Sequence, residues 1–529
     1  MTWTAIADTC SFAKSYHSTP GITLTRFTNI DPPVLAQKSP NIFAFRATIQ
    51  NGVGVTLSSN QGIWGNGGPL SQGLPTTLTP WLIAREGDPV PASPAGSMGL
   101  IGNSNAFTVK ALQVNAVGQT YATVNIDAPG TGSAYLMDNC CLQTLAASGP
   151  GAPFVYSNLQ SVVTSSFGNQ VAGWARDFTP RSGTMEWLPT AGMLPCATVP
   201  FGNISWQTTP AIPGGSGLYR PIPTRVASPA ISERGIVAHH AVDSILPIVH
   251  RPHIRVDRNT GSVGVVVRTG WATGGGDFFG NFHTNLLAVC DSPAPMAHTV
   301  AWQMQDLRAT PTGPPITGSN SLWAKCATGP FHRIAQVGLP ALDVPAGNFY
   351  GSFHALHVVG PATTTGDSLV IFGVRLMGVN AGKTVIYSAP ITAGGTVLGT
   401  YTRIATDVPG ACAVNPILTG ADTIANLFPF FSTNTEGDVL IKATLFSAPA
   451  ANRQVLISAR AAAGHPLTVR SQSGMPITPG MCTTAATITN FTIANPEQGT
   501  YSRGQAISSM QGIGARVNFT GGHGAFIGF

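Results

Sequence analysis

Charged residues are scarce in this chain. Asp, Glu, Lys and Arg make up 9% of its 529 residues, whereas about 25% is usual for a soluble domain. The 27 basic and 21 acidic residues give a net charge of +6, but they form no basic run, so the sequence does not predict nucleic-acid binding. A surface covered mainly by Thr, Ser, Asn, Gln and Gly is typical of extracellular or assembled proteins. Among charged partners, the weak positive charge favours acidic glycans.

Long hydrophobic segments are also lacking. No stretch of about 20 apolar residues is present, so the sequence predicts no transmembrane segment. The start Met1–Thr4 has neither the basic nor the apolar region of a signal peptide. It fits a cytosolic protein or a mature secreted form, and the composition favours the second. We therefore expect an extracellular or cell-surface location, with a cytoplasmic one as the alternative.

Signatures of common enzyme classes are missing. The sequence contains no G-x-S-x-G, no H-E-x-x-H and no P-loop, and the glycines Gly274–Gly276 lie between expected strands rather than before a helix. Asp88 and Asp407 follow expected strands, where a carboxylate usually caps a turn. A glycosidase could still recruit two such groups.

Helical periodicity is absent, and a repeat takes its place. The 61 Gly and 42 Pro exclude a mainly helical protein, and 43% hydrophobic residues exclude a disordered one. Similar apolar segments open each repeat, for example Ile83–Pro89 and Ile334–Pro340. They divide the chain into approximate units 6–82, 83–144, 145–195, 196–265, 266–333, 334–403, 404–468 and 469–529.

Each unit carries the pattern of four strands. Alternating segments such as Phe43–Thr48 are typical of half-buried strands, and each unit ends in a short apolar strand such as Gly62–Trp64. Four antiparallel strands form one propeller blade. The sequence therefore predicts an all-β fold: a single β-propeller over residues 1–529, with eight four-stranded blades and seven as the fallback. The strand at Trp3–Thr9 should pair with Gly524–Phe529 and close the ring.

The repeat pattern also resembles a known group of proteins. Phe43–Thr48, Gly62–Trp64 and Ile83–Pro91 are similar to the units of large, mostly uncharacterised bacterial repeat proteins that often carry surface-sorting tails. The match is close over residues 37–91 and fades elsewhere. The resemblance implies a secreted, propeller-like bacterial protein, although this chain lacks the sorting tail.

The eight cysteines give no metal motif. They lie at positions 10, 140, 141, 196, 290, 326, 412 and 482 without a C-x-x-C spacing, and about half are expected to be small core residues. The adjacent Cys140 and Cys141 could form the strained disulfide that eight-bladed quinone-dependent alcohol dehydrogenases contain, but the tryptophan-rich repeat of that family is missing. Two ordinary cysteines on opposite faces of a strand are the alternative.

Histidines are the main candidates for chemistry. His239, His240, His250 and His253 are close together in the sequence, and neutral imidazoles bind copper, zinc and iron. If His239 and His240 share a strand, they point to opposite faces, so only one of them can join a given site.

A second pair of histidines occupies equivalent positions in neighbouring units. Gly276–His283 matches Gly347–His354, so His283 and His354 could face one metal site. The structural alternative is a hydrogen bond that fixes a turn.

Two classes of function remain. The first is a non-catalytic extracellular or cell-surface propeller that binds a glycan, a protein or copies of itself. The second is an enzyme with a site at the channel mouth, either metal-dependent through the histidines or hydrolytic through carboxylates. No cofactor is required by the sequence, although a His-ligated metal ion is compatible with it.

Overall fold

The computed structural model describes the greater part of the chain, and almost all of what it describes is β-structure. The described residues are 3–9, 26–37, 39–50, 60–67, 78–90, 101, 109–115, 118–126, 132–138, 142–149, 156–164, 171–177, 182–187, 201–205, 219–220, 229–232, 235–240, 242–243, 253–257, 262–291, 298–327, 329–360, 368–391, 398–461, 466–478, 486–494 and 506–528. The helical element within them is the short 3₁₀ turn Ala450–Asn452. The prediction of an all-β fold is confirmed.

The strands of the first part of the chain form small antiparallel sheets that follow one another in sequence. They are β1 (Trp3–Asp8), β2 (Phe27–Ile30), β3 (Val34–Ala36), β4 (Ser39–Ile49), β5 (Gln61–Gly65), β6 (Trp81–Arg85), β7 (Val109–Val114), β8 (Thr120–Ile126), β9 (Gly132–Asp138), β10 (Leu142–Ser148), β11 (Tyr156–Thr164), β12 (Val171–Asp177), β13 (Ser182–Trp187) and β14 (Phe201–Ser205). The sheets have the orders β2-β4-β5-β6, with β3 also on β4, then β7-β8-β9-β10 and β11-β12-β13-β14. The last two are joined at their edges by one parallel pair, Ser148 with Tyr156.

The second part of the chain continues in the same way. Its strands are β15 (Tyr219–Arg220), β16 (Ala230–Ile231), β17 (Val237–His240), β18 (Val242–Asp243), β19 (His253–Asp257), β20 (Ser262–Val267), β21 (Phe278–Phe279), β22 (Phe282–Asp291), β23 (His298–Met304), β24 (Leu307–Arg308), β25 (Ser321–Cys326), β26 (His332–Gln336), β27 (Asn348–Val359), β28 (Ser368–Gly378), β29 (Thr384–Ile391), β30 (Thr402–Thr406), β31 (Ala413–Val414), β32 (Asp422–Thr433), β33 (Asp438–Leu445), β34 (Gln454–Arg460), β35 (Thr468–Gln472), β36 (Pro476–Ile477), β37 (Ala486–Ile493), β38 (Ile513–Phe519) and β39 (Gly522–Gly528). The main sheets are β16-β17-β19-β20, β22-β23-β25-β26, β27-β28-β29-β30, β31-β32-β33-β34-β35 and β36-β37-β38-β39-β1.

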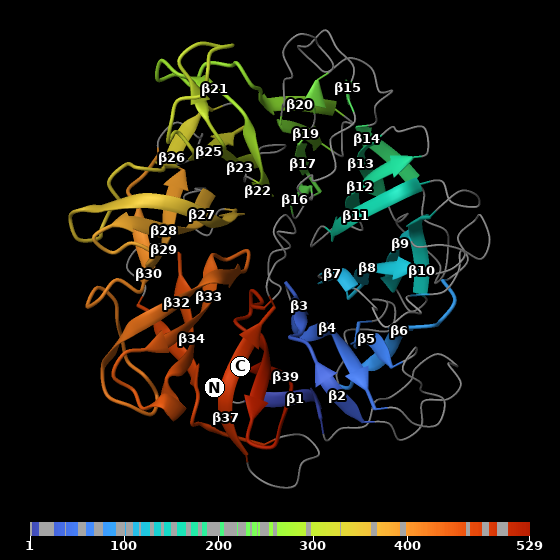
Figure 1. Cartoon of the computed structure of the whole chain (residues 1–529). Helices are drawn as coiled ribbons and strands as arrows, with labels where there is room; N and C mark the ends of the chain where they lie inside the picture. Colours follow the sequence, from blue (N-terminus) through green and yellow to red (C-terminus); the bar gives the residue numbers. More distant parts are fainter. Residues whose placement is uncertain are drawn as a thin grey trace.

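The sheets are arranged around a common centre, and in sheets such as β7–β10 and β16–β20 the first strand lies nearest the centre and the last strand farthest out (Figure 1). Inner strands of neighbouring sheets contact one another, as β22 does with β16 and with β27. The ring closes where the N-terminal strand β1 pairs with β39, from Trp3 opposite Gly528 to Asp8 opposite Gly524. The predicted terminal pairing is confirmed, and a closed ring of small antiparallel sheets is the architecture of a β-propeller.

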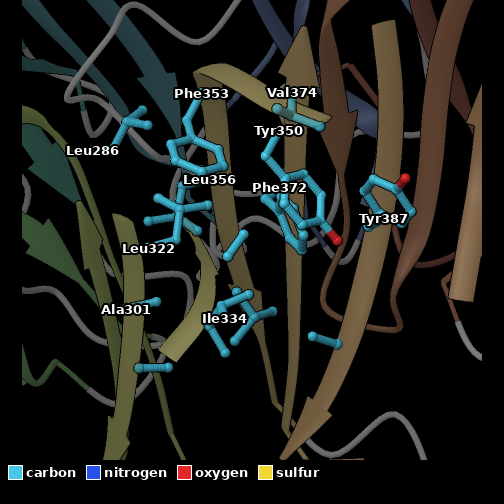
Figure 2. Close-up of a cluster of buried hydrophobic side chains, with 14 of the residues drawn as sticks. Leu286, Ala301, Leu322, Ile334, Tyr350, Phe353, Leu356, Phe372, Val374 and Tyr387 are labelled. Carbon is cyan, nitrogen blue, oxygen red and sulfur yellow. The ribbon is translucent and has the colours of Figure 1, made fainter. Parts of the chain in front are cut away.

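The hydrophobic core lies between neighbouring sheets. Side chains of β22–β26 and β27–β30 meet in one such layer, where Leu322 and Ile334 face Phe353 and Phe372 (Figure 2). Along β28, Phe372 packs in this layer, while Ile371 packs in the next one, against the sheet β31–β35. The prediction of half-buried strands is therefore wrong for these elements. Packing between two neighbours covers both faces, so alternate residues enter two different core layers.

Each outer strand contains one β-bulge, an extra residue without a partner on the neighbouring strand. The outer strands are β1, β6, β10, β14, β20, β26, β30 and β35, and their bulge residues are Ile6, Ile83, Leu145, Ile204, Val266, Ile334, Ile404 and Arg470. Seven of these residues are aliphatic, and the one in β35 is an arginine. The bulge therefore marks one structurally equivalent position around the ring.

A four-residue turn follows several outer strands. In Arg85–Asp88, Arg268–Trp271, Gln336–Leu339 and Gln472–Met475, the N–H of the fourth residue donates to the carbonyl of the first. The third residue is a glycine with a φ between 83° and 90°, at Gly87, Gly270, Gly338 and Gly474. Only glycine adopts this conformation without strain. The recurring glycine of the repeat is thus a requirement of the turn.

A five-residue turn precedes the second strand in four sheets. It occupies Asn115–Gln119, Ser232–Ile236, Asn434–Asp438 and Ser508–Gly512. In each copy the side-chain oxygen of the first residue accepts the N–H of the fifth. The fourth residue has a positive φ, which is 88° at Gly118, 93° at Gly235, 80° at Gly437 and 59° at Gln511.

The alternation of strand direction gives the ring two different faces. The connections between sheets, and those from the second to the third strand of a sheet, lie on one face, which we call the inter-sheet face. The connections from first to second and from third to fourth strand lie on the other, which we call the turn face because it carries the five-residue turns.

Candidate functional site

Of the four clustered histidines, His239 and His240 lie in β17, and His253 is the first residue of β19. His239, in β17, is buried, and complete burial lowers the pKa of its imidazole to about 3, so the ring is neutral at physiological pH. His240 is the register partner of His253 on β19. The side chains of these two residues, and all of His250, lie outside the described residues. The proposed metal site at this cluster stays a prediction.

The two repeat-related histidines lie at equivalent places, His283 near the start of β22 and His354 within β27. The imidazole of His354 packs against Gly373, where an added Cβ would come within 2.7 Å of its Nε2. Burial, followed by the positive charge of Arg375, lowers the pKa of His354 to about 4. The side chain of His283 lies outside the described residues, so the pair is placed by backbone alone.

Within the described part of the chain, no group of three or more His, Cys, Asp or Glu side chains could hold a metal ion. Cys326 and Cys412 are free thiols there. The predicted pair Cys140 and Cys141 lies outside the described residues, so the disulfide remains a prediction.

The carboxylates of Asp88 and Asp407 accept hydrogen bonds from backbone N–H groups. The Asp88 carboxylate accepts the N–H of Arg85 at 3.1 Å, within the four-residue turn. Asp407 accepts the N–H of Thr384 at 2.6 Å and the N–H of Leu427, on the next sheet, at 3.1 Å. Burial raises the pKa of both carboxyls. Their contacts are those of turn caps and sheet connectors.

Large apolar side chains are exposed mainly on the inter-sheet face. We call this set the apolar rim; it comprises Trp271, Ile316, Leu339, Leu342, Phe349, Met377, Val379, Ile417, Leu418 and Phe446. Eight of the ten belong to the connections that enter or cross the three adjacent sheets β22–β26, β27–β30 and β31–β35, and the other two, Phe349 and Met377, are register partners near the ends of β27 and β28. Val379 and Phe446 are the most exposed, at 77% and 70%. Of the described large apolar residues that are exposed, Met510 alone lies on the turn face, at 69%.

A polar pocket opens between the last two sheets of the ring. Its volume is about 200 Å³, and its walls are Asp438, Ser458, Ala459, Arg460, Pro466, Thr468, Arg470, Ile507 and Gln511. The Arg460 Nε lies 3.3 Å from the Asp438 carboxylate, and an Nη of Arg470 donates to the side-chain oxygen of Gln511 at 2.9 Å. The first-to-second and third-to-fourth connections form the walls, so the pocket belongs to the turn face.

Sequence reasoning missed both the apolar rim and the pocket. The rim residues look like ordinary hydrophobic residues of loops when read singly. The pocket had a detectable signal, because Asn115–Gln119 and Asn434–Asp438 share the pattern N-x-x-G-[QD]. The turn at Ser508–Gly512 differs from that pattern at its first, fourth and fifth positions, so the pattern points to the pocket only through Asp438.

No family model matches the chain, and no curated protein matches it. Solved structures with a similar course of the chain include the WD40 domain of SCAP from fission yeast, with a TM-score of 0.37, 5% identity and 95% of each chain covered. An oligogalacturonate lyase in complex with manganese has a TM-score of 0.35 and 10% identity, covering 80% of this chain and 96% of the lyase. The six-bladed fungal lectin of Aleuria aurantia has a TM-score of 0.27 and 10% identity, covering 66% of this chain and 89% of the lectin. Scores of this size define no activity, and the propeller architecture rests on the sheets and their closure.

In the part of the chain that the structure describes, no helix is long and apolar enough to cross a membrane.

Proposed function

We propose that this chain is an eight-bladed β-propeller that acts outside the cell as a non-catalytic binding and assembly module, with the apolar rim as its contact surface. The observation that carries the proposal is the concentration of ten exposed apolar side chains on one face, over three adjacent sheets. Contiguous exposed apolar surface rimmed by polar residues is characteristic of protein interaction sites.

The outer strands support the number of blades. Eight strands carry the equivalent bulge, and each ends a group of four antiparallel strands. The eight-stranded sheet β7–β14 counts as two blades, because a single parallel pair joins its halves.

Within the central blade of the apolar rim, β27–β30, two neighbouring segments of the rim are in contact. An added Cβ on Gly347 would come within 2.9 Å of Val379, and one on Gly378 within 3.2 Å of Phe349. These short separations place the loop before β27 against the turn after β28. The apolar side chains of the two connections therefore belong to one surface.

A second copy of the chain is the partner that we propose first. With a net charge of +6 over 529 residues, two copies repel each other only weakly, and salt at physiological strength screens the repulsion further. The scarcity of charge supports an extracellular, assembled state in the same way.

Sedimentation velocity over a range of concentrations tests this function. The double variant Val379→Ser/Phe446→Ser should lose self-association that the wild type shows. Met510→Ser is the matched control, because Met510 is as exposed as Phe446 but lies on the turn face. A wild-type protein that remains monomeric at high concentration, or variants that all associate equally, would contradict the proposed assembly.

A further inference from the structure

The polar pocket is built by two departures from the repeat, and the first is Arg470. The bulge position of the outer strand holds Ile, Leu or Val in seven strands and Arg470 in β35. The aliphatic bulge residues are mostly buried in the layer between sheets, as Ile404 is at 8% exposure. A bulge re-aims its side chain away from the regular alternation of the strand. At this one place it presents a guanidinium group to the pocket wall.

The second departure is Gln511. The fourth position of the five-residue turn is glycine in three copies and Gln511 in the fourth, where φ is 59°. A residue with a Cβ is disfavoured in this left-handed region. Strained backbone of this kind is kept mainly where the side chain has a function.

These two exceptional residues contact each other. The Arg470 guanidinium donates to the Gln511 side-chain oxygen at 2.9 Å, although the residues lie on different sheets. The Arg470 Nε is buried and has no hydrogen-bond partner. Gln511 is neutral, so it orients the guanidinium without cancelling its charge.

The remaining walls of the pocket are rigid and polar. The Asn434 side chain donates to the Asp438 carboxylate and to the Ser508 carbonyl, both at 2.9 Å, which ties the two five-residue turns together. Asp438 in turn holds Arg460. Because that pair is neutral, the pocket carries one uncompensated positive charge, at Arg470.

We infer that this pocket is a binding site for a small hydroxylated carboxylate, such as a uronic acid, with Arg470 as the carboxylate ligand and Gln511 as the positioning residue. An arginine fork matches the two oxygens of a carboxylate. The hydroxyl groups of Ser458 and Thr468, which also line the pocket, supply partners for the hydroxyls of the ligand.

Size and charge restrict the ligand class. The pocket, about 200 Å³, is smaller than the roughly 300–1,000 Å³ of sites for drug-sized ligands, so it accommodates a single ring. A dianion such as phosphate would exceed the single free positive charge. A monoanionic carboxylate balances the charge. This site lies on the turn face and goes beyond the binding function proposed for the apolar rim.

Isothermal titration with sodium glucuronate, and with glucose as the neutral counterpart, tests the inference. Wild-type protein should bind glucuronate saturably in the millimolar range and glucose far more weakly. Arg470→Gln should weaken glucuronate binding roughly tenfold or more, because a charge-assisted pair is lost. Arg333→Gln is the matched control: Arg333 makes the same kind of bond to Gln336, at 2.9 Å, on another sheet, and its loss should leave binding unchanged.

Gln511→Gly separates a binding role from a structural one. Glycine restores the residue of the other turns and relieves the positive φ, so this variant should resist urea at least as well as the wild type while binding glucuronate more weakly. The inference is overturned if wild type shows no saturable glucuronate binding at millimolar concentration, if glucose binds equally well, or if a folded Arg470→Gln protein retains full affinity.

Discussion

Substitution of Ile6 tests whether the N-terminal strand closes the ring. It is the bulge residue of β1 and is 7% exposed, and Ile404 is the bulge residue of β30 and is 8% exposed. The two side chains occupy equivalent places, but β30 is continuous with its sheet along the chain, whereas β1 joins its sheet only through pairing with β39. If the β1–β39 pairing is as stable as the pairing of β30 within its own sheet, Ile6→Ala and Ile404→Ala should lower the free energy of unfolding by similar amounts.

The expected cost follows from burial. Truncating a buried isoleucine to alanine usually costs about 2–5 kcal/mol, through lost transfer free energy and the cavity that remains. Terminal strands that are not held down fray, and substitutions in them have little effect. Urea unfolding followed by tryptophan fluorescence measures both variants. A cost below about 0.5 kcal/mol for Ile6→Ala, beside a full cost for Ile404→Ala, would refute closure by β1.

Three further predictions concern single residues. Gly338→Ala should lower the free energy of unfolding by about 1–2 kcal/mol, because φ is 83° and an added Cβ meets nothing within 4 Å. Gly132→Ala should lower it further in the same assay, because its Cβ would clash with the carbonyl oxygen of Ser148. Burial raises the pKa of Asp138 from its usual 3.8 to about 7, so the folded state holds this proton more tightly. The free energy of unfolding should therefore fall as pH rises through that interval, and thermal melts of Asp138→Asn should show a smaller fall. The pKa of His354 is lowered from 6.5 to about 4, so stability should fall as pH drops through that interval, and His354→Gln should show a smaller loss in acid melts than wild type.

The parts of the fold that sequence could predict are those governed by local chemistry. The glycine of Ile83–Pro89 marks a turn that needs a positive φ, and the recurrence of that segment gives the order of the strands. The pairing of Trp3–Asp8 with Gly522–Gly528 followed from the type of strand at each end. The bounds of the eight repeat units, the metal site at the histidines and the Cys140–Cys141 disulfide stay predictions.

The candidate site could not be predicted because packing creates it. Arg470 and Gln511 are 41 residues apart, and only the contact between neighbouring sheets brings them together. In the sequence, Val469 looks like the start of the last unit, whereas the bulge places Arg470 at the equivalent position. The departure from the repeat becomes visible only once the strands are aligned by their bulges. The prediction that strands such as Leu369–Val374 are buried on one face only was wrong for a related reason. Periodicity within one strand does not reveal whether neighbouring sheets pack against one of its faces or both.

The pairing of β1 with β39 affects how the chain folds during its synthesis on the ribosome. Trp3 and Gly528 are register partners, and at the usual 5–20 residues per second, roughly 25–100 s separate their synthesis. During that interval β1 has no strand to pair with, and its neighbouring core layer, which includes Phe43 and Trp64, lacks one wall. An unpaired strand beside open apolar surface is a site of misassembly between nascent chains. Slow translation should therefore lower the yield of soluble protein.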